Sequence, residues 1–220
     1  MRRLPLFPLP LVLFPGAPLP LHVFEPRYRQ LLADCLAGDR EFGIVFLPPQ
    51  VRERELPPGH VGCVARVTDS VLLEDGRSNL LVVGGDRFAL ERLAETGTPY
   101  LVGEVREWAD LPEDAGRLAA GAARVRGLFD RVARAARTLS DDDEAVPALP
   151  DDDARLSFAV ASHVDLDAGA RQRLLQSRSP TARLDELETL LAAAVAPLEQ
   201  RAVVHRRAKT NGHGPHTTDE

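Results

Sequence analysis

The chain contains a single lysine, Lys209, and this limits the chemistry that the sequence can support. A P-loop needs the string Gly-x-x-x-x-Gly-Lys-Ser/Thr, whose lysine reaches the phosphates of a nucleotide, and these 220 residues contain no such string. A Ser-Lys peptidase needs a buried lysine that acts as a base, whereas Lys209 lies in a polar C-terminal segment. Arginine cannot take this role because it stays protonated. The sequence therefore predicts a protein that is not an enzyme of either class.

The histidines do not form a recognisable catalytic or metal site. His22 alternates with Leu21 and Val23 on a predicted strand, and no serine or cysteine lies near it in sequence. A catalytic triad needs such partners, so an exposed or structurally bonded histidine is the favoured interpretation. Three further histidines could bind a metal weakly, but they lie in a solvated polar run: His205, His213 and His216.

Cysteines, acidic runs and glycine pairs also favour structural interpretations. Cys35 and Cys63 form no Cys-x-x-Cys pair, which predicts two reduced, partly buried thiols. The acidic runs at residues 141–144 and 151–153 lack the glycine and terminal glutamate of an EF-hand loop. The glycines at 84–85 lie between predicted strands and not at a strand-to-helix turn, so they do not indicate a phosphate loop. We expect no catalytic residue, no metal site and no cofactor.

Composition and charge indicate an ordinary globular protein. Hydrophobic residues make up 44% of the chain and charged residues 27%, and the formal net charge of −6 gives no hint of a nucleic-acid-binding surface. Residues 4–21 superficially resemble a signal peptide, but six prolines interrupt them and would prevent a helix. No other apolar run approaches the ~20 residues that a membrane span needs. We expect a cytoplasmic protein that does not interact with membranes.

The first half of the chain predicts strands around one helix. Glu25 and Pro26 open a helix that ends at the capping residue Gly38. Pro20 interrupts a strand, so it should lie at a sheet edge or a bulge. Apolar or alternating segments bounded by turn signals predict strands at residues 4–7, 18–24, 42–47, 60–73, 78–83, 87–93 and 100–108.

Turn signals in this half suggest how the strands connect. Residues 75–76, Asp-Gly, predict a hairpin turn, and residues 84–86, Gly-Gly-Asp, predict a tight connection between two further strands. A proline-rich polar loop is expected at residues 50–59. Turn signals at intervals of about ten residues favour an antiparallel barrel or sandwich.

After Trp108 the periodicity becomes helical. A 4-3-4-3-4-3 spacing marks one apolar helix face, formed by Leu118, Ala122, Val125, Phe129, Val132, Ala136 and Leu139. An acidic linker at 140–150 precedes a predicted helix at 151–163, and Asp167 should cap a short helix that ends near Gln176. The last helix should begin at Pro180, and Pro197 should kink it or end it early. We therefore expect a β-rich subdomain over residues 1–108, a helical bundle over 109–204 and a disordered tail over 205–220.

Three ordered blocks resemble the N-terminal domain family of Lon proteases. They are LPLFPLPLVLFPGAPLPLHVFEPRYRQLL at residues 4–32, VGCVARVTDSVLLEDGRSNLLVVGGDRFALERL at 61–93 and ARQRLLQSRSPTARLDELETLL at 170–191. The string LHVFEPRYR looks especially like the stand-alone bacterial members. The resemblance implies an α+β fold in which a PUA-like β-barrel precedes an α-helical bundle.

The resemblance implies a non-catalytic protein-interaction module that binds unfolded or substrate polypeptides, or serves as an adaptor in proteolysis. Its partners would be polypeptide substrates, a protease or a chaperone. Such sites need exposed apolar surface, so we expect the contacts at and near the proline-rich loops. The candidate polypeptide-binding residues are Phe14, Pro15, Phe24, Tyr28, Phe46 and Leu47.

Two questions stay open at this level. The charged and aromatic residues Glu25, Arg27, Tyr28 and Arg87 could form a recognition surface, or an ion pair and helix start that hold the first helix to the strands. The second interpretation is favoured. RNA binding is the alternative function, since PUA-like barrels also occur in RNA-modifying proteins. It ranks lower because aromatic residues make up only 5% of the chain and acidic residues outnumber basic ones.

Overall fold

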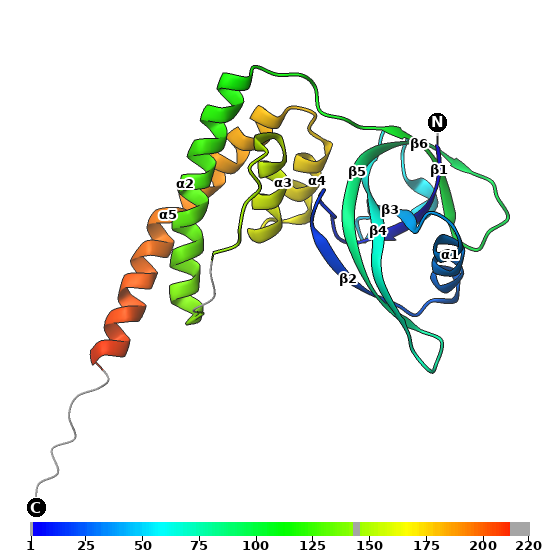
Figure 1. The fold of residues 1–220 in the computed structure, drawn as a ribbon, viewed down its shortest axis with the longest axis horizontal. Helices are drawn as coiled ribbons and strands as arrows, with labels where there is room; N and C mark the ends of the chain where they lie inside the picture. Colours follow the sequence, from blue (N-terminus) through cyan, green and yellow to red (C-terminus); the bar gives the residue numbers. More distant parts are fainter. Residues whose placement is uncertain (1, 143–145, 212–220) are drawn as a thin grey trace, which may run out of the picture. The chain divides into compact units, whose positions relative to one another are not determined.

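The structure is a computed structural model that describes residues 2–142 and 146–211 (Figure 1). It confirms the predicted α+β class and contains two compact units. Within the described residues, the first unit comes from Met1–Pro112 and Phe158–Ser179, and the second from Glu113–Ser157 and Pro180–Glu220. This division differs from the expected boundary after residue 108, because the helix α4 (Ala168–Gln176) packs on the strands.

The sheet of the first unit contains six strands within the described residues. They are β1 (Arg2–Leu9), β2 (Pro18–Val23), β3 (Glu41–Phe46), β4 (Val61–Leu72), β5 (Ser78–Ala94) and β6 (Leu101–Glu107). Their order is β2-β5-β4-β3-β1-β6. Strand β6 also pairs with β5, so the pairings of β5, β4, β3, β1 and β6 form a closed ring, and β2 pairs with β5 outside it. The expectation of a purely antiparallel sheet is wrong for β1 and β3, which are parallel. Parallel neighbours need a crossover connection, which β2 and the helix α1 (Pro26–Ala37) supply here.

Strand β5 is continuous over 17 residues, which corrects the prediction of two strands joined at residues 84–86. The backbone N–H of Gly84 donates to the Ala17 carbonyl oxygen at 2.9 Å, and its own carbonyl accepts from Gly16 N at 2.8 Å. A register shift between Cys63 and Ala65 of β4 lies beside Gly84. The glycine therefore marks the place where the turn before β2 lies against β5, and it does not mark a chain reversal.

The core of the first unit lies between the strands. Its central cluster consists of buried apolar side chains: Leu4, Leu6, Val45, Leu56, Val64, Phe88, Leu90 and Val105. Helix α1 begins at Pro26, and Gly38 caps its C-terminal end as predicted, with its N–H donating to Cys35 O at 3.0 Å. The predicted turn at residues 75–76 is also confirmed, and it joins β4 to β5.

The second unit contains two long helices, α2 (Ala115–Ser140) and α5 (Pro180–Asn211), which run side by side (Figure 1). Ion pairs between them recur along their length, and the residue numbers increase on both helices, so the helices are parallel. The pairs are Arg117–Asp185, Arg124–Glu188 and Arg131–Glu199. The helix α3 (Asp153–His163) begins in this unit, and the division between the units falls within it.

The apolar face of α2 follows the prediction only over its first part. Ala122, Val125 and Phe129 are buried, but Ala136 is exposed and Ala135 is buried instead. An α-helix has 3.6 residues per turn, so a contact line between two helices does not follow a strict seven-residue repeat over many turns. The buried face of α2 therefore changes position towards its C-terminal end.

Helix α5 is longer than expected. It does not end at Pro197, which is exposed, and it continues to Asn211, beyond the predicted end at residue 204. Ala202 is buried, and both His205 and Lys209 contact Asp141 at the end of α2, so this stretch has tertiary partners that a disordered tail lacks. The rest of the predicted tail, residues 212–220, lies outside the described residues.

We predict opposite effects for two Gly→Ala substitutions. A Cβ at Gly84 would overlap the carbonyl oxygen of Phe14, so G84A should lower the free energy of unfolding by at least about 2 kcal/mol. A Cβ at Gly127, within α2, would meet no atom within 4 Å, so G127A should raise stability by about 1 kcal/mol. Urea unfolding followed by circular dichroism measures both, and equal effects would contradict the assigned backbone contact.

Phe129 should be a principal core residue of the second unit. Its side chain is buried on α2, so Phe129→Ala should lower the free energy of unfolding by about 3–5 kcal/mol through the cavity it leaves. Leu190 on α5 is exposed, so Leu190→Ala should cost less than about 1 kcal/mol. Thermal and urea unfolding of both variants test this, and a larger loss for Leu190→Ala would show that the packing is misassigned.

Candidate functional site

Phe14 is a core residue, so its expected role in an exposed contact loop is wrong. Its side chain is 1% exposed, its ring stacks on Phe158 with centroids 5.7 Å apart, and the guanidinium of Arg171 lies 5.3 Å from the ring centroid. The loop turns its largest apolar side chain inward because its backbone is held against Gly84. Phe14 can therefore support a binding surface but cannot contact a ligand directly.

Tyr28 is buried as well, and ion pairs surround it at the N-terminal end of α1. Its ring stacks on Phe7 at 4.0 Å between centroids, and its hydroxyl donates to Glu53 Oε1 at 3.1 Å. Arg27 donates to both carboxylate oxygens of Glu53, at 2.7 and 2.9 Å, and to Glu25 at 2.9 Å. These contacts hold the start of α1 to the loop after β3, which agrees with the structural interpretation of this group.

Arg87 has a separate structural role in the first unit. It is buried, and it donates to the carbonyl oxygens of Leu175 and Ser177 at 2.8 and 2.6 Å and to the Asp110 carboxylate at 2.5 Å. Carbonyls at the C-terminal end of a helix lack partners within the helix, so a cation there is stabilising. Arg87 therefore holds the end of α4 and the segment after β6 to strand β5.

The other four candidate residues differ in exposure. Pro15, Phe46 and Leu47 are half-buried, and Leu47 packs against the central core cluster. Phe24 is 59% exposed in the short connection between β2 and α1. Of the six candidates, Phe24 is the one that presents a large apolar side chain to solvent.

The register of the sheet brings further exposed residues together. Pro20 pairs with Leu81, and His22 pairs with Asn79, which in turn pairs with Val71. Residues directly opposite each other on paired strands share one face of a sheet. These five exposed residues form what we call the outer strand face, and Phe24 extends it through a ring contact with His22 at 6.1 Å between centroids. Val71 and Leu81 were not singled out from sequence, because only strand pairing places β4 and β5 residues on one face with those of β2.

Two prolines limit the backbone hydrogen bonding of the free edge of β2. The Ala17–Gly84 hydrogen bond sets the alternation of bonded and non-bonded pairs, so residues 18, 20 and 22 direct their backbone nitrogens away from β5. Pro18 and Pro20 have no N–H to donate. Such an edge is a poor template for an added strand, and this confirms the prediction that Pro20 lies at an edge. Ligands would have to be recognised mainly through side chains.

A groove of about 530 Å³ lies between α1 and the β4–β5 hairpin. We call it the α1–hairpin groove. Helix α1 contributes Pro26, Arg29, Gln30, Leu32, Ala33 and Leu36. The hairpin contributes Ser70, Leu72, Gly76 and Ser78. Leu72 is 75% exposed, so one wall presents an apolar side chain to solvent beside a single charged residue, Arg29.

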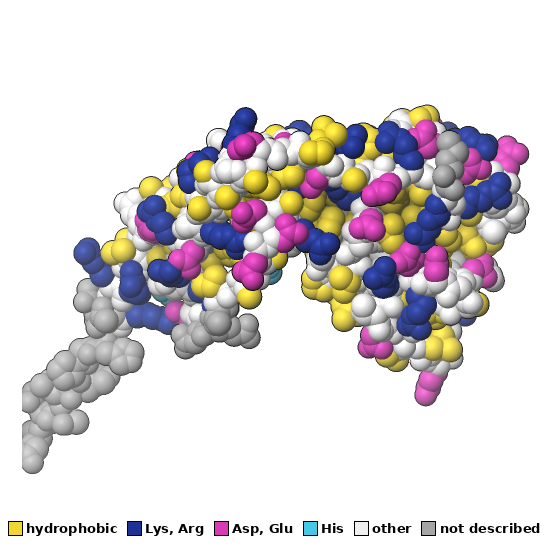
Figure 2. All heavy atoms as spheres, turned by 45° about the horizontal axis from the view of Figure 1, so that its top comes forward, with side chains coloured by type: hydrophobic (Ala, Val, Ile, Leu, Met, Phe, Trp, Pro, Cys, Tyr) yellow, Lys and Arg dark blue, Asp and Glu magenta, His cyan; other side chains and the backbone are white. Residues whose placement is uncertain are grey.

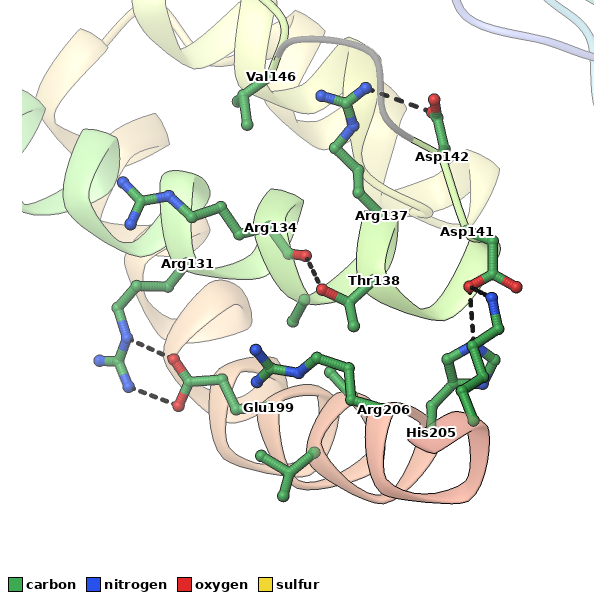
Figure 3. Close-up of a pocket in the computed structure, with 14 residues that line it drawn as sticks. Arg131, Arg134, Arg137, Thr138, Asp141, Asp142, Val146, Glu199, His205 and Arg206 are labelled. Atoms are coloured by element: carbon green, nitrogen blue, oxygen red, sulfur yellow. Dashed lines mark hydrogen bonds and ion pairs between the residues drawn. The ribbon is translucent and has the colours of Figure 1, made fainter. Parts of the chain in front are cut away.

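A second cavity, of about 920 Å³, lies between the C-terminal parts of α2 and α5 (Figure 3). Basic side chains line it, but several of them pair with carboxylates at its rim. Arg131 binds both carboxylate oxygens of Glu199, at 2.8 and 2.9 Å. Asp141 accepts from His205 at 3.0 Å and from Lys209 at 2.5 Å. Carboxylates of the lining therefore neutralise much of the positive charge of its basic side chains, and these ion pairs link α2 to α5.

Two cysteines and one histidine of the first unit have shifted pKa values. Burial raises the pKa of both Cys35 and Cys63 to about 12, so neither thiol is a nucleophile at neutral pH. Burial also lowers the pKa of His60. Across the described residues, no group of three or more His, Cys, Asp or Glu side chains could hold a metal ion. The helices described here also include none that is both long and apolar enough to cross a bilayer.

Two phenylalanines of the first unit should respond differently to the same substitution. Phe14→Ala should lower the free energy of unfolding by about 3–5 kcal/mol because the ring is buried. Phe24→Ala should change it by less than about 1 kcal/mol because the ring is largely in solvent. Urea unfolding of both variants tests the assignment, which fails if Phe24→Ala is the more destabilising change.

Sequence comparisons find relatives among Lon proteases. Lon protease 1 of Myxococcus xanthus is 26% identical over 93% of this chain, and Lon protease 2 of Herpetosiphon aurantiacus is 26% identical over 90% of it. The chain covers 26% and 24% of these two proteins, so it spans about a quarter of the length of the curated relatives it matches.

Solved structures show the same fold. The crystal structure of a Lon N-terminal domain protein from Xanthomonas campestris is similar with a TM-score of 0.57 and 28% identity, over 85% of this chain and 97% of that one. The N-terminal domain of the Mycobacterium avium complex Lon protease gives a TM-score of 0.64 at 19% identity, over 87% and 98% of the two chains. The pattern of the family described as the ATP-dependent protease La (LON) substrate-binding domain matches residues 3–193. The chain therefore belongs to the LON substrate-binding domain family, as its sequence blocks indicated.

Proposed function

We propose that this protein binds polypeptide substrates destined for proteolysis, through exposed apolar side chains of its first unit. The observation that carries the proposal is the exposure of Phe24 and Leu72, at 59% and 75%, on elements next to α1. Large apolar side chains gathered at a surface favour contact with other apolar groups. The family's description as a substrate-binding domain supports the same role.

The proposed contact surface consists of the outer strand face, Phe24 and the α1–hairpin groove. Pro15, Phe46 and Leu47 are kept as secondary candidates because they are only half-buried. Phe14 and Tyr28 act from below the surface by fixing the loop before β2 and the start of α1. Because prolines occupy the free edge of β2, side-chain contacts contribute more to binding than strand addition does.

The finer features of the protein follow as part of the same proposal. We propose that the sheet is a PUA-like barrel, which the additional pairing of β6 with β5 supports, and that the protein acts without catalysis of its own, either as a binding module or as an adaptor for a protease. The absence of a P-loop string and of a body lysine from the 220 residues supports this. We propose that the protein acts in the cytoplasm.

RNA binding has less support. On the face drawn in Figure 2, basic side chains alternate with acidic ones and form no large area of one charge. Many arginines are paired with carboxylates, as Arg66 is with Glu41 at 2.7 Å. A surface of this kind releases few counterions from a phosphate backbone.

The proposal is tested with a permanently unfolded, carboxymethylated protein as the ligand, in the absence of ATP. Replacing Phe24 and Leu72 together by serine should weaken binding about tenfold, because two exposed apolar contacts are lost. The matched control is Leu190→Ser on α5, which removes an exposed leucine from the second unit and should leave the affinity unchanged. Fluorescence anisotropy measures the affinities. Equal affinity for all three proteins would contradict the proposed surface.

A further inference from the structure

Arg29 is the charged residue of the α1–hairpin groove, and the groove offers it no counter-charge. The Arg29 backbone N–H bonds the Glu25 carbonyl oxygen within α1, but its guanidinium makes no hydrogen bond or ion pair with the described residues, and none of those lining the groove is acidic. Neighbouring arginines differ in this respect. Arg27 binds Glu53, and Arg77 binds Asp75 at 2.5 Å. The groove therefore contains a guanidinium without a counter-charge, together with apolar side chains such as Leu36 and Leu72.

The hairpin turn allows Arg29 to lie across the groove. Gly76 has φ of 78°, which suits glycine, and a Cβ at this position would overlap the Arg29 guanidinium. The guanidinium thus lies against bare backbone at the hairpin end of the groove. Leu72 and Leu36 supply apolar surface from the hairpin and from α1 respectively. The same short groove can contact an apolar side chain and a negative charge together.

We propose that the α1–hairpin groove binds the C-terminal end of a polypeptide whose last residue is apolar, with Arg29 binding the terminal carboxylate. This inference rests on the proposed function and names a substrate class for it. A guanidinium presents two parallel N–H donors that match a carboxylate, and such charge-assisted bonds are the strong ones. Leu72 and Leu36 receive the side chain of the last residue.

A chain terminus fits the groove better than an acidic side chain does. A C-terminal apolar residue carries its carboxylate and its apolar side chain on one Cα, so both contacts are made within one residue. An internal aspartate or glutamate replaces the apolar side chain by the carboxylate, which would leave Leu72 without an apolar partner. The carboxylate of the terminus would also offset the charge of Arg29.

Fluorescein-labelled peptides with a Gly-Ser repeat and a Leu-Leu end test the inference on the full 220-residue chain. The first peptide ends in a free carboxylate and the second in an amide. The third is the amide with an internal glutamate. The free carboxylate should bind about tenfold more tightly than the amide, which is ~1.4 kcal/mol, and the glutamate peptide should bind like the amide. Added salt should reduce the difference.

Substitutions test whether Arg29 causes the preference for a free carboxylate over an amide. Arg29→Met keeps an aliphatic stem and a good helix former but removes the charge, so the two Leu-Leu peptides should then bind equally. Arg29→Lys keeps the charge and should retain part of the preference. The matched control is Arg77→Met, which removes a charge from the same hairpin outside the groove and should leave the preference unchanged.

The outcomes separate this inference from the proposed function. Equal binding of carboxylate and amide by the unmodified protein, or a preference that survives in Arg29→Met, would overturn the carboxylate site while binding of the unfolded protein still stands. Equal binding of the glutamate and carboxylate peptides would overturn the assignment to a chain terminus. If neither the peptides nor the unfolded protein bind, both proposals fail.

Discussion

The first unit depends on the continuity of strand β5. Its N-terminal part pairs with β2, its C-terminal part pairs with β6, and β4 accompanies it along most of its length. One strand can serve all three partners only if it stays extended through Gly84, where the loop before β2 lies against its backbone. A side chain at this point would displace that loop, and Phe14 would lose its place in the core. The same contact sets which residues of β2 form backbone hydrogen bonds with β5, and as a result the backbone nitrogens of Pro18 and Pro20 face the open edge of the sheet.

Arginine serves the structure more than it serves ligand binding. Arg87 and Arg183 are both buried, where a planar guanidinium can satisfy several oxygens at once. Arg87 joins β5 to the end of α4, and Arg183 donates to Ser157 Oγ and to the Ala154 carbonyl oxygen at 2.8 and 2.9 Å. In the second unit, arginine–carboxylate pairs follow the contact between α2 and α5. Such pairing explains how an arginine-rich chain has no extended basic area on the face shown in Figure 2.

The arginine pairs do not involve the exposed apolar residues of the first unit or the Arg29 guanidinium. The open edge of β2 disfavours backbone pairing, so the sheet is protected from strand addition while Val71, Leu81 and Phe24 stay available for side-chain contacts. The α1–hairpin groove adds Arg29 beside Leu72. Apolar surface supplies affinity with little sequence preference, and a single well-placed charge supplies selectivity. The proposed binding surface combines both properties.

Local sequence determined most of the elements. Pro26 and Gly38 define the ends of α1, residues 75–76 define the hairpin turn, and Asp167 caps α4 by accepting from Ala170 N at 2.8 Å. These features depend on residues a few positions apart, so they can be predicted without knowledge of the fold. Three sequence blocks also indicated the family, which suggested the substrate-binding hypothesis without any tertiary contact.

Tertiary structure decided what the sequence pattern left open. Phe14 lies in a proline-rich loop that reads as exposed, but its ring is buried because residues about 70 and 140 positions away, Gly84 and Phe158, pack against the loop. Leu72 has an apolar side chain of the kind found in cores, yet it is exposed at the end of β4, where it pairs with Ser78. Arg29 resembles any other helix-surface arginine until the hairpin places Gly76 against it. Exposure and charge pairing depend on contacts between distant segments, and local propensity carries no information about which segments meet.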